Sequence, residues 1–212
     1  MASGFPGSID SFTNPLTTSP LNSPSHAGQH QDLNDAVNKI ETYMGLTKVI
    51  PSAATGTGVS LSASGTITFS SSSTITVTTF SALYDNYRLE ISNVTGSTPL
   101  DIRFQLSGVT TGVYNQANVY VNTSSTVTGY GVAGNTYSVC GGADVGNANS
   151  MSIDIFGPFT TNRTAISGHG FFLNGSMLIG SQIVDTNSRS GFVLTTSTGT
   201  ISGTLRIYGY RN

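Results

Sequence analysis

The sequence has 212 residues, of which 8% are charged, and a formal net charge of −2. Its eight Lys and Arg residues form no cluster, which excludes the basic surface that nucleic-acid binding requires. A single cysteine, Cys140, excludes an internal disulfide, and no apolar run approaches the ~18 residues that a membrane span needs.

Residues 1–30 are rich in Pro, Ser, Thr, Asn and Gly, a composition that cannot bury a core of its own. We therefore expect an extended arm that lies against a partner molecule. A few apolar side chains recur along this segment and are the candidate anchoring contacts: Phe5, Ile9, Phe12, Leu16 and Leu21.

Residues 31–46 contain the clearest helical pattern. Four apolar residues recur at spacings of four, three and four, as in the seam of a coiled coil: Leu33, Val37, Ile40 and Met44. Asp32 is a suitable N-cap, and Gly45 a suitable residue to end the helix.

A helix of about 12 residues is only marginally stable in water, so another surface must cover this seam. The seam either packs on the β domain of its own chain or associates with copies from other chains. Its narrowness favours association, and β-branched residues at both seam positions favour three chains.

Residues 47–58 are expected to be a linker, and residues 59–212 an antiparallel β-sandwich or jelly roll with roughly eight to ten strands. Apolar and polar residues alternate through much of this region, and Asn174-Gly175 is a strong hairpin signal. The polar, glycine-rich stretch 122–135 is expected to be an exposed loop. The alternation places the following residues inward: Ile67, Phe69, Ile75, Val77, Tyr87, Leu89, Ile91, Leu100, Ile102, Phe104, Leu106, Met151, Ile153, Ile155, Ile201, Gly203, Leu205 and Ile207.

No catalytic motif stands out. Glu90, Asp101 and Asp154 could in principle supply a glycosidase pair, but they occupy outward positions of alternating strands, which favours a solvated surface. We therefore expect no enzymatic activity and no cofactor. Cys140 is expected to be a buried strand residue.

Two groups of residues leave a binding role open. His26 and His30 would share a face if the helix extended backwards, which would allow a metal or anion site, although Gly28 between them disfavours a helix. Hydrogen bonding or capping is favoured, and no metal site is predicted. Four tyrosines could line a sugar-binding surface, because aromatic rings stack on sugar faces, although tyrosine is also common in β-sheets. They are Tyr114, Tyr120, Tyr130 and Tyr137.

Three stretches resemble virion structural proteins of tailed bacteriophages. The segment PSHAGQHQDLNDAVNKIETYMG, after a polar arm, resembles a motif of phage tail fibres, minor tail proteins and head-attached proteins. The stretch FSALYDNYRLEISNVTGSTPLDIRFQLS is similar to a phage β-sandwich module, and GTLRIYGYRN is similar to the final strand of that module.

This resemblance implies a non-enzymatic homotrimer on the phage particle surface, made in the host cytoplasm. Its arm would anchor it to another virion protein, either the major capsid protein or a tail component. We expect a capsid decoration or head-fibre protein, because the chain has no long shaft. The alternative is a tail-fibre or tail-tip adhesin whose β domain binds a host surface glycan or receptor. No nucleic acid or membrane partner is expected.

Overall fold

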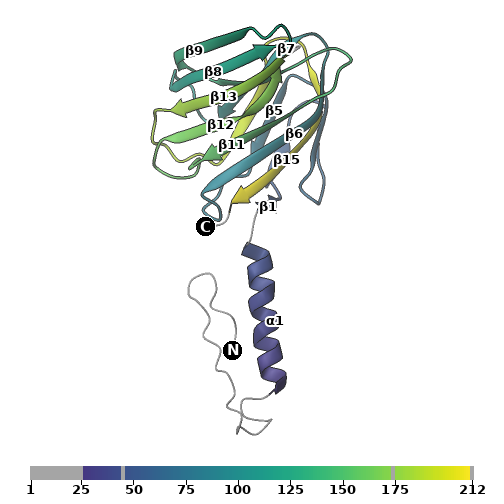
Figure 1. Cartoon of the computed structure of the whole chain (residues 1–212), viewed down its shortest axis with the longest axis vertical. Coiled ribbons are helices and arrows are strands. Elements are labelled where there is room, and N and C mark those ends of the chain that lie inside the picture. Colours follow the sequence, from purple (N-terminus) through teal and green to yellow (C-terminus); the bar gives the residue numbers. More distant parts are fainter. Residues whose placement is uncertain (1–25, 44–45, 173–174, 211–212) are drawn as a thin grey trace. The chain divides into compact units, whose positions relative to one another are not determined.

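The computed structural model describes residues 26–43, 46–172 and 175–210 (Figure 1). The chain divides into two compact units, with the boundary between Thr47 and Lys48. The first unit contains the helix α1, and the second, Lys48–Tyr210, contains the β-sandwich. Of the residues expected to form the extended arm, 1–25 lie outside the described residues.

Helix α1 spans His26–Tyr43, 18 residues, or about 27 Å of rise. It begins within the stretch expected to be arm, five residues before the predicted start at residue 31. Asp32 is consequently an interior residue and not the N-cap. Once a helix is nucleated, each further residue adds a backbone hydrogen bond at little cost, so Gly28 is accommodated at about 1 kcal/mol.

The sandwich consists of two antiparallel sheets of ten and five strands, so the predicted antiparallel β-sandwich is confirmed. The large sheet has the order β3-β4-β15-β6-β11-β12-β13-β8-β9, with β1 also paired to β15, and the small sheet has the order β10-β7-β14-β5-β2. The strands of the large sheet are β1 (Leu46–Val49), β3 (Val59–Leu61), β4 (Ile67–Ser72), β6 (Asn86–Gly96), β8 (Tyr114–Asn122), β9 (Val127–Asn135), β11 (Asn149–Phe156), β12 (Thr164–Phe172), β13 (Gly175–Ile183) and β15 (Ile201–Tyr210). Those of the small sheet are β2 (Ala53–Thr55), β5 (Thr74–Thr78), β7 (Leu100–Leu106), β10 (Ser138–Ala143) and β14 (Gly191–Thr196).

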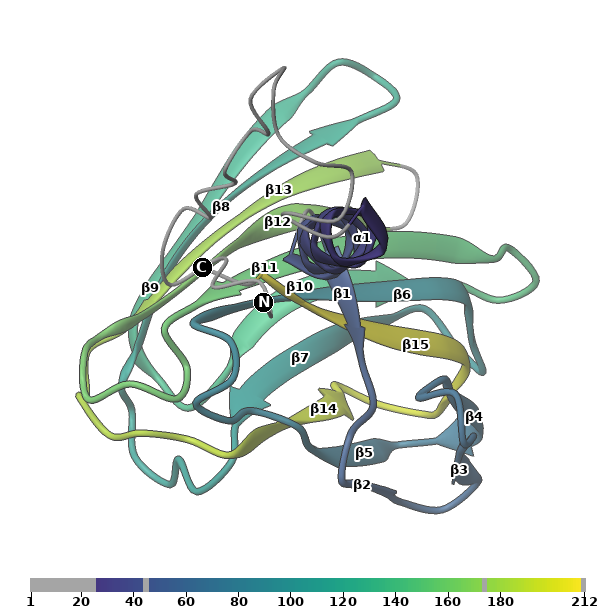
Figure 2. The same ribbon diagram turned by 90° about the horizontal axis from the view of Figure 1, so that it is seen from below.

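The chain crosses repeatedly between the two layers, which Figure 2 shows nearly edge-on. Strand β4 lies in the large sheet and β5, one residue later, in the small one; β6, β7 and β8 alternate in the same way. Each crossing lets the apolar face of one strand meet that of the next across the interior, so the core is built from many sequence-distant pairs.

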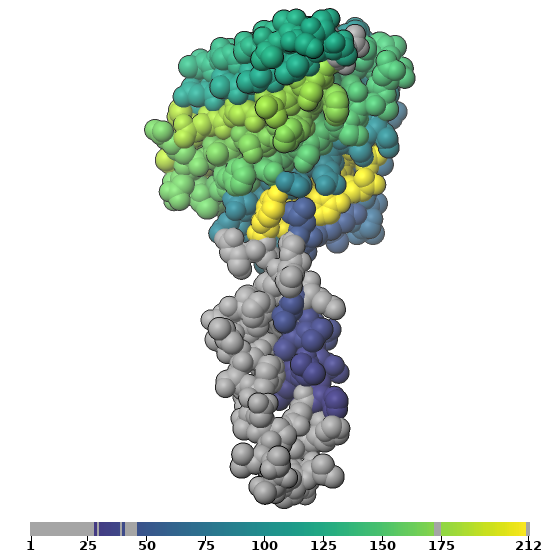
Figure 3. All heavy atoms as spheres, in the orientation of Figure 1, coloured from purple at the N-terminus to yellow at the C-terminus, as the bar shows by residue number. Residues whose placement is uncertain are grey.

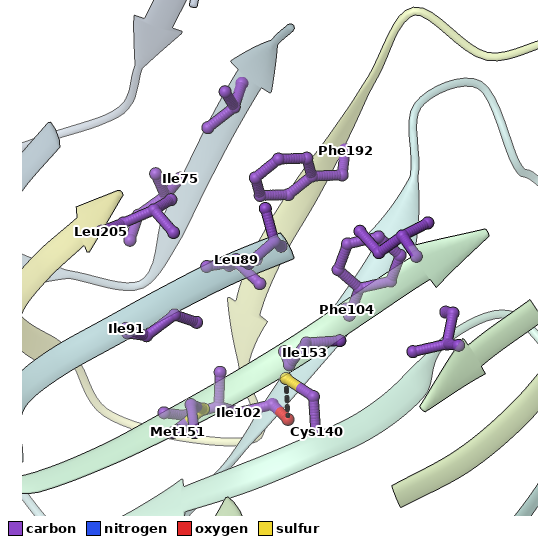
Figure 4. Close-up of a cluster of buried hydrophobic side chains, with 14 of the residues drawn as sticks. Ile75, Leu89, Ile91, Ile102, Phe104, Cys140, Met151, Ile153, Phe192 and Leu205 are labelled. Atoms are coloured by element: carbon purple, nitrogen blue, oxygen red, sulfur yellow. Dashed lines mark hydrogen bonds between the residues drawn. The ribbon is translucent and has the colours of Figure 1, made fainter. Parts of the chain in front are cut away.

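The core lies between the sheets and is filled by the inward side chains of alternating strands (Figure 4). Phe104 and Phe192 stack with ring centroids 5.4 Å apart, and Phe80 contacts Phe192 at 5.8 Å. Every residue that the alternation placed inward is buried except Gly203, which is half-buried where a register shift interrupts the pairing of β15 with β4. Period-two patterning therefore predicted this part of the fold correctly, since a strand with one face in a core must alternate.

Three features differ from the expectations. The described residues hold 15 strands, more than the eight to ten expected; β1, β2 and β3 are only three or four residues long, and β9 lies in a stretch expected to be a loop. The expected linker 47–58 contains β2 and most of β1. The expected loop 122–135 contains β9, whose side chains are mostly exposed. As an edge strand, β9 is held by backbone pairing to β8 and needs no apolar alternation.

Candidate functional site

Helix α1 carries an exposed apolar seam. Leu33, Val37 and Ile40 are 53%, 43% and 41% exposed. Their spacings of four and three place them along one face of the helix. The fourth predicted seam residue, Met44, lies outside the described residues. Three aliphatic side chains aligned on one helix face are the arrangement that a second helix can pack against.

The structure does not describe the residues that were predicted to anchor the arm. Phe5, Ile9, Phe12, Leu16 and Leu21 all lie outside the described residues. Helix α1 includes both His26 and His30, and His30 is exposed. Within the described ranges, no three His, Cys, Asp or Glu side chains gather closely enough to hold a metal ion.

A half-open pocket of about 250 Å³ brings together three of the four candidate tyrosines, Tyr120, Tyr130 and Tyr137. We call it the tyrosine pocket. Asp101 is the acidic residue of the pocket lining, and Val139 and Met177 are apolar lining residues. These residues come from β7, β8, β9, β10 and β13 and from Tyr137 just before β10, so the pocket exists only in the folded sandwich.

Register explains how the tyrosine pocket forms. Asn118 lies opposite Tyr130, and Tyr120 lies opposite Met177, so all four side chains point from the same, inner face of the β13–β8–β9 end of the large sheet. On the other side, Val139 lies opposite Arg103, two residues from Asp101, on one face of the β10–β7 pair. The pocket opens where these two faces meet.

Strand β8 reverses the usual alternation. Gln116 and Asn118 point inward and are 4% and 3% exposed, whereas Val119 and Val121 point outward and are 39% and 38% exposed. Buried amides are costly unless they are hydrogen-bonded, so both must serve a specific purpose here.

That purpose is to tie β8 to β10. Gln116 Nε2 donates to the Val139 carbonyl at 2.8 Å, and the Val139 amide donates back to Gln116 Oε1 at 3.1 Å. Asn118 Nδ2 donates to the same carbonyl at 3.1 Å, and the Gly180 amide donates to Asn118 Oδ1 at 3.2 Å. These bonds fix the separation of the two walls of the tyrosine pocket.

The tyrosine rings are also held in place. The guanidinium carbon of Arg103 lies 4.3 Å from the centroid of the Tyr137 ring, a cation–π contact that covers one ring face. Gly175 leaves room for the Tyr120 ring, because a methyl group at that position would overlap ring carbons. The Asp101 amide donates to the Ser197 hydroxyl and the Ser197 amide donates to the Asp101 carbonyl, each at 2.9 Å, while no hydrogen bond to the Asp101 carboxylate occurs among the described residues.

The fourth candidate, Tyr114, takes no part in this pocket. It is fully buried, its hydroxyl accepts a hydrogen bond from the Leu106 amide at 2.6 Å, and burial raises the pKa of the phenol well above its ordinary value. Tyr114 is therefore a core residue, and its possible sugar-stacking role is excluded by the fold.

The outer face of the large sheet carries a polar network centred on Asp154. Arg88 donates to both carboxylate oxygens of Asp154, at 2.8 and 2.7 Å, and the Tyr210 hydroxyl donates to Oδ1 at 2.6 Å. Burial acts to raise the pKa of Asp154, but the bonds from Arg88 and Tyr210 outweigh it and hold that pKa below its ordinary value. Asp154 is thus a paired carboxylate. An ionised carboxylate that accepts three hydrogen bonds is suited to holding strands together and not to donating a proton.

An exposed apolar patch lies beside this network on the same outer face. We call it the outer patch. Figure 3 views the sandwich from this side, with β8 and β9 in teal and β12 and β13 in green. Val119 lies opposite Leu178, and Val121 opposite Val127, so these residues share one surface. The members of the outer patch are Val119, Val121, Val127, Phe171 and Leu178, each between 38% and 65% exposed.

Cys140 is fully buried in β10, as predicted (Figure 4). Its thiol points to the Ile102 carbonyl at 3.3 Å, and burial raises its pKa to about 12. A protonated, inaccessible thiol is neither a nucleophile nor a metal ligand.

No protein-family model matches the chain, and no curated protein matches it. Within the described part of the chain, no helix is both long and apolar enough to cross a membrane.

Proposed function

We propose that this chain is a non-enzymatic structural protein of a tailed-phage virion, a homotrimeric capsid decoration or head-fibre protein anchored by its N-terminal arm. The exposed seam of α1 is the observation that carries this proposal. Leu33, Val37 and Ile40 each leave about half of their surface in water in the single chain. Packing against two further copies of the same helix would remove that surface from water.

The sandwich supports the same proposal in two ways. Its surface has few charges, so neighbouring copies repel one another weakly. The outer patch provides additional apolar surface for contact with neighbouring chains. Two of the described residues that could do acid–base chemistry are used otherwise: Asp154 is engaged by Arg88 and Tyr210, and Cys140 is buried.

The oligomeric state tests the seam directly. We expect Val37→Asp combined with Ile40→Asp to convert the trimer to monomers, because two carboxylates per chain would be placed on the shared axis. Light scattering after size-exclusion chromatography measures the mass. The matched control adds the same two charges on another face of α1, as Gln31→Asp with Asn38→Asp, and should remain trimeric. A native mass for the seam variant would refute the coiled-coil account.

Particle assembly tests the arm. We expect a chain lacking residues 1–24 to remain a folded oligomer and to be absent from purified phage particles, as measured by immunoblotting. Normal incorporation of this truncated chain would place the anchor elsewhere. Immunogold labelling of intact particles then distinguishes the two locations: label over the whole capsid supports decoration, and label confined to the tail supports the alternative, an adhesin.

A further inference from the structure

We propose that the tyrosine pocket binds one neutral pyranose unit of a glycan. The pocket volume of about 250 Å³ is below the 300–1,000 Å³ typical of drug-sized ligand sites, so it suits a single ring and not an extended chain. This inference concerns one sandwich and does not depend on the proposed trimer.

The pocket offers the two kinds of contact that a sugar ring requires. The residues Tyr120, Tyr130 and Tyr137 line the pocket, and the π face of a tyrosine ring attracts the weakly positive C–H groups on the face of a pyranose. Val139 and Met177 add further apolar surface for the same C–H groups. Aromatic and apolar lining of this kind excludes water without demanding a hydrogen bond at every point.

Asp101 supplies the polar selectivity. An ionised carboxylate is an acceptor only, and two adjacent sugar hydroxyls can donate to its two oxygens. Because no hydrogen bond to this carboxylate occurs among the described residues, its acceptor capacity remains available to a ligand. Of the described residues, Asp101 is the only charged one that lines the pocket, so an acidic sugar would bring a second negative charge next to it; the guanidinium of Arg103 contacts Tyr137 but is not part of the lining.

A quaternary ammonium ion is the competing ligand for a cluster of aromatic rings. The position of Arg103 argues against it. Its guanidinium already occupies one face of the Tyr137 ring at 4.3 Å, so that ring face cannot receive a second cation.

The walls of the pocket are formed before any ligand arrives. The bonds from Gln116 and Asn118 to the Val139 carbonyl fix the distance between β8 and β10. The cation–π contact of Arg103 fixes the orientation of the Tyr137 ring. A preformed site spends little binding free energy on ordering its own side chains, which helps a small, weakly bound sugar.

Saturation-transfer NMR on the full-length protein tests the proposal, because it detects binding in the millimolar range. The probes are the methyl glycosides of glucose, galactose, mannose and N-acetylglucosamine, together with choline and glucuronic acid. We expect transfer to at least one neutral glycoside and none to choline or glucuronic acid. Absence of signal from all four glycosides, or a signal from choline or glucuronic acid alone, would overturn the proposal.

Two variants locate the binding. Tyr130→Ala removes the most exposed ring of the pocket, and Asp101→Asn removes the charge while keeping the shape; each should weaken binding about tenfold or more. The matched control is Tyr208→Ala, on the outer face of β15, which should bind as the wild type does. Melting curves verify that each variant is folded. Unchanged binding by both pocket variants would show that the sugar sits elsewhere.

The seam variant Val37→Asp with Ile40→Asp separates this proposal from the proposed function. It should lose the trimer and retain the monosaccharide signal. If the wild type binds a neutral glycoside and this variant does not, the site requires more than one chain, and the assignment to a single sandwich is wrong.

Discussion

Replacing Asp154 by Asn should lower the stability of the sandwich by about 1–2 kcal/mol. Hydrogen bonds to a charged group contribute roughly 1.5–3 kcal/mol each in buried settings. Here the estimate is reduced, because the Arg88 side chain is 33% exposed and can regain water, and because asparagine keeps one acceptor oxygen. For a domain of this size, about 2–4 °C of melting temperature corresponds to 1 kcal/mol, so we expect a decrease of about 2–8 °C.

The stabilising contribution of the Asp154 carboxylate should depend on pH. The pKa of Asp154 is lower in the folded state than its ordinary value of ~3.9, because the bonds from Arg88 and Tyr210 outweigh burial. The carboxylate therefore stabilises the fold fully above that ordinary value, and its contribution is lost as pH falls through the lower folded pKa. The difference in melting temperature between the wild type and Asp154→Asn should be complete at neutral pH and shrink below pH ~4.

Differential scanning calorimetry across this pH range measures both effects. Asp101→Asn is the matched control: it makes the same charge change at a carboxylate to which no described residue donates a hydrogen bond, and it should leave the melting temperature nearly unchanged. Equal melting temperatures for wild type and Asp154→Asn at neutral pH, or a difference that does not vary with pH, would refute the stabilising role of the network.

Three further predictions concern the sandwich. Phe192→Ala should cost about 3–5 kcal/mol, since it empties a fully buried position stacked on Phe104; an unchanged urea midpoint would contradict that packing. Gly58→Ala should destabilise by more than about 1 kcal/mol, because φ is +71° and a Cβ would overlap the Ser70 carbonyl; the same midpoint measurement decides it. Cys140 should resist thiol reagents in the native protein at mildly alkaline pH and react once per chain in guanidinium chloride, because its pKa is raised to about 12; reaction in the native state would mean that β10 opens readily.

Alternation in the sequence predicted the core strands well and failed where a strand serves something other than the core. Strands such as β7 put Leu100, Ile102 and Phe104 inside and their polar neighbours outside, and the burial follows that pattern. In β8 the polar residues Gln116 and Asn118 point inward and Val119 and Val121 outward, so hydropathy alone would assign the wrong face.

The tyrosine pocket was only partly foreseeable. The sequence identified four tyrosines, but strand register decides that Tyr120 and Tyr130 share a face and that Tyr114 belongs to the core. No local pattern in the sequence indicates that Asp101 of β7 lines the tyrosine pocket. The one available signal was the pair of amides in NQANVYVN, whose inward placement violates the usual pattern and marks a site where two layers are tied together.

The placement of β15 affects how the protein reaches its native state. This strand lies between β4 and β6 in the large sheet, and Ser202 of β15 bonds to the amide of Ser71, 131 residues earlier. During synthesis, β4 and β6 therefore emerge from the ribosome long before β15. The edge of each strand that pairs with β15 remains unpaired in the nascent chain until β15 has been made. A chaperone that shields exposed strand edges during synthesis should raise the soluble yield of this protein more than that of a sandwich closed by local hairpins.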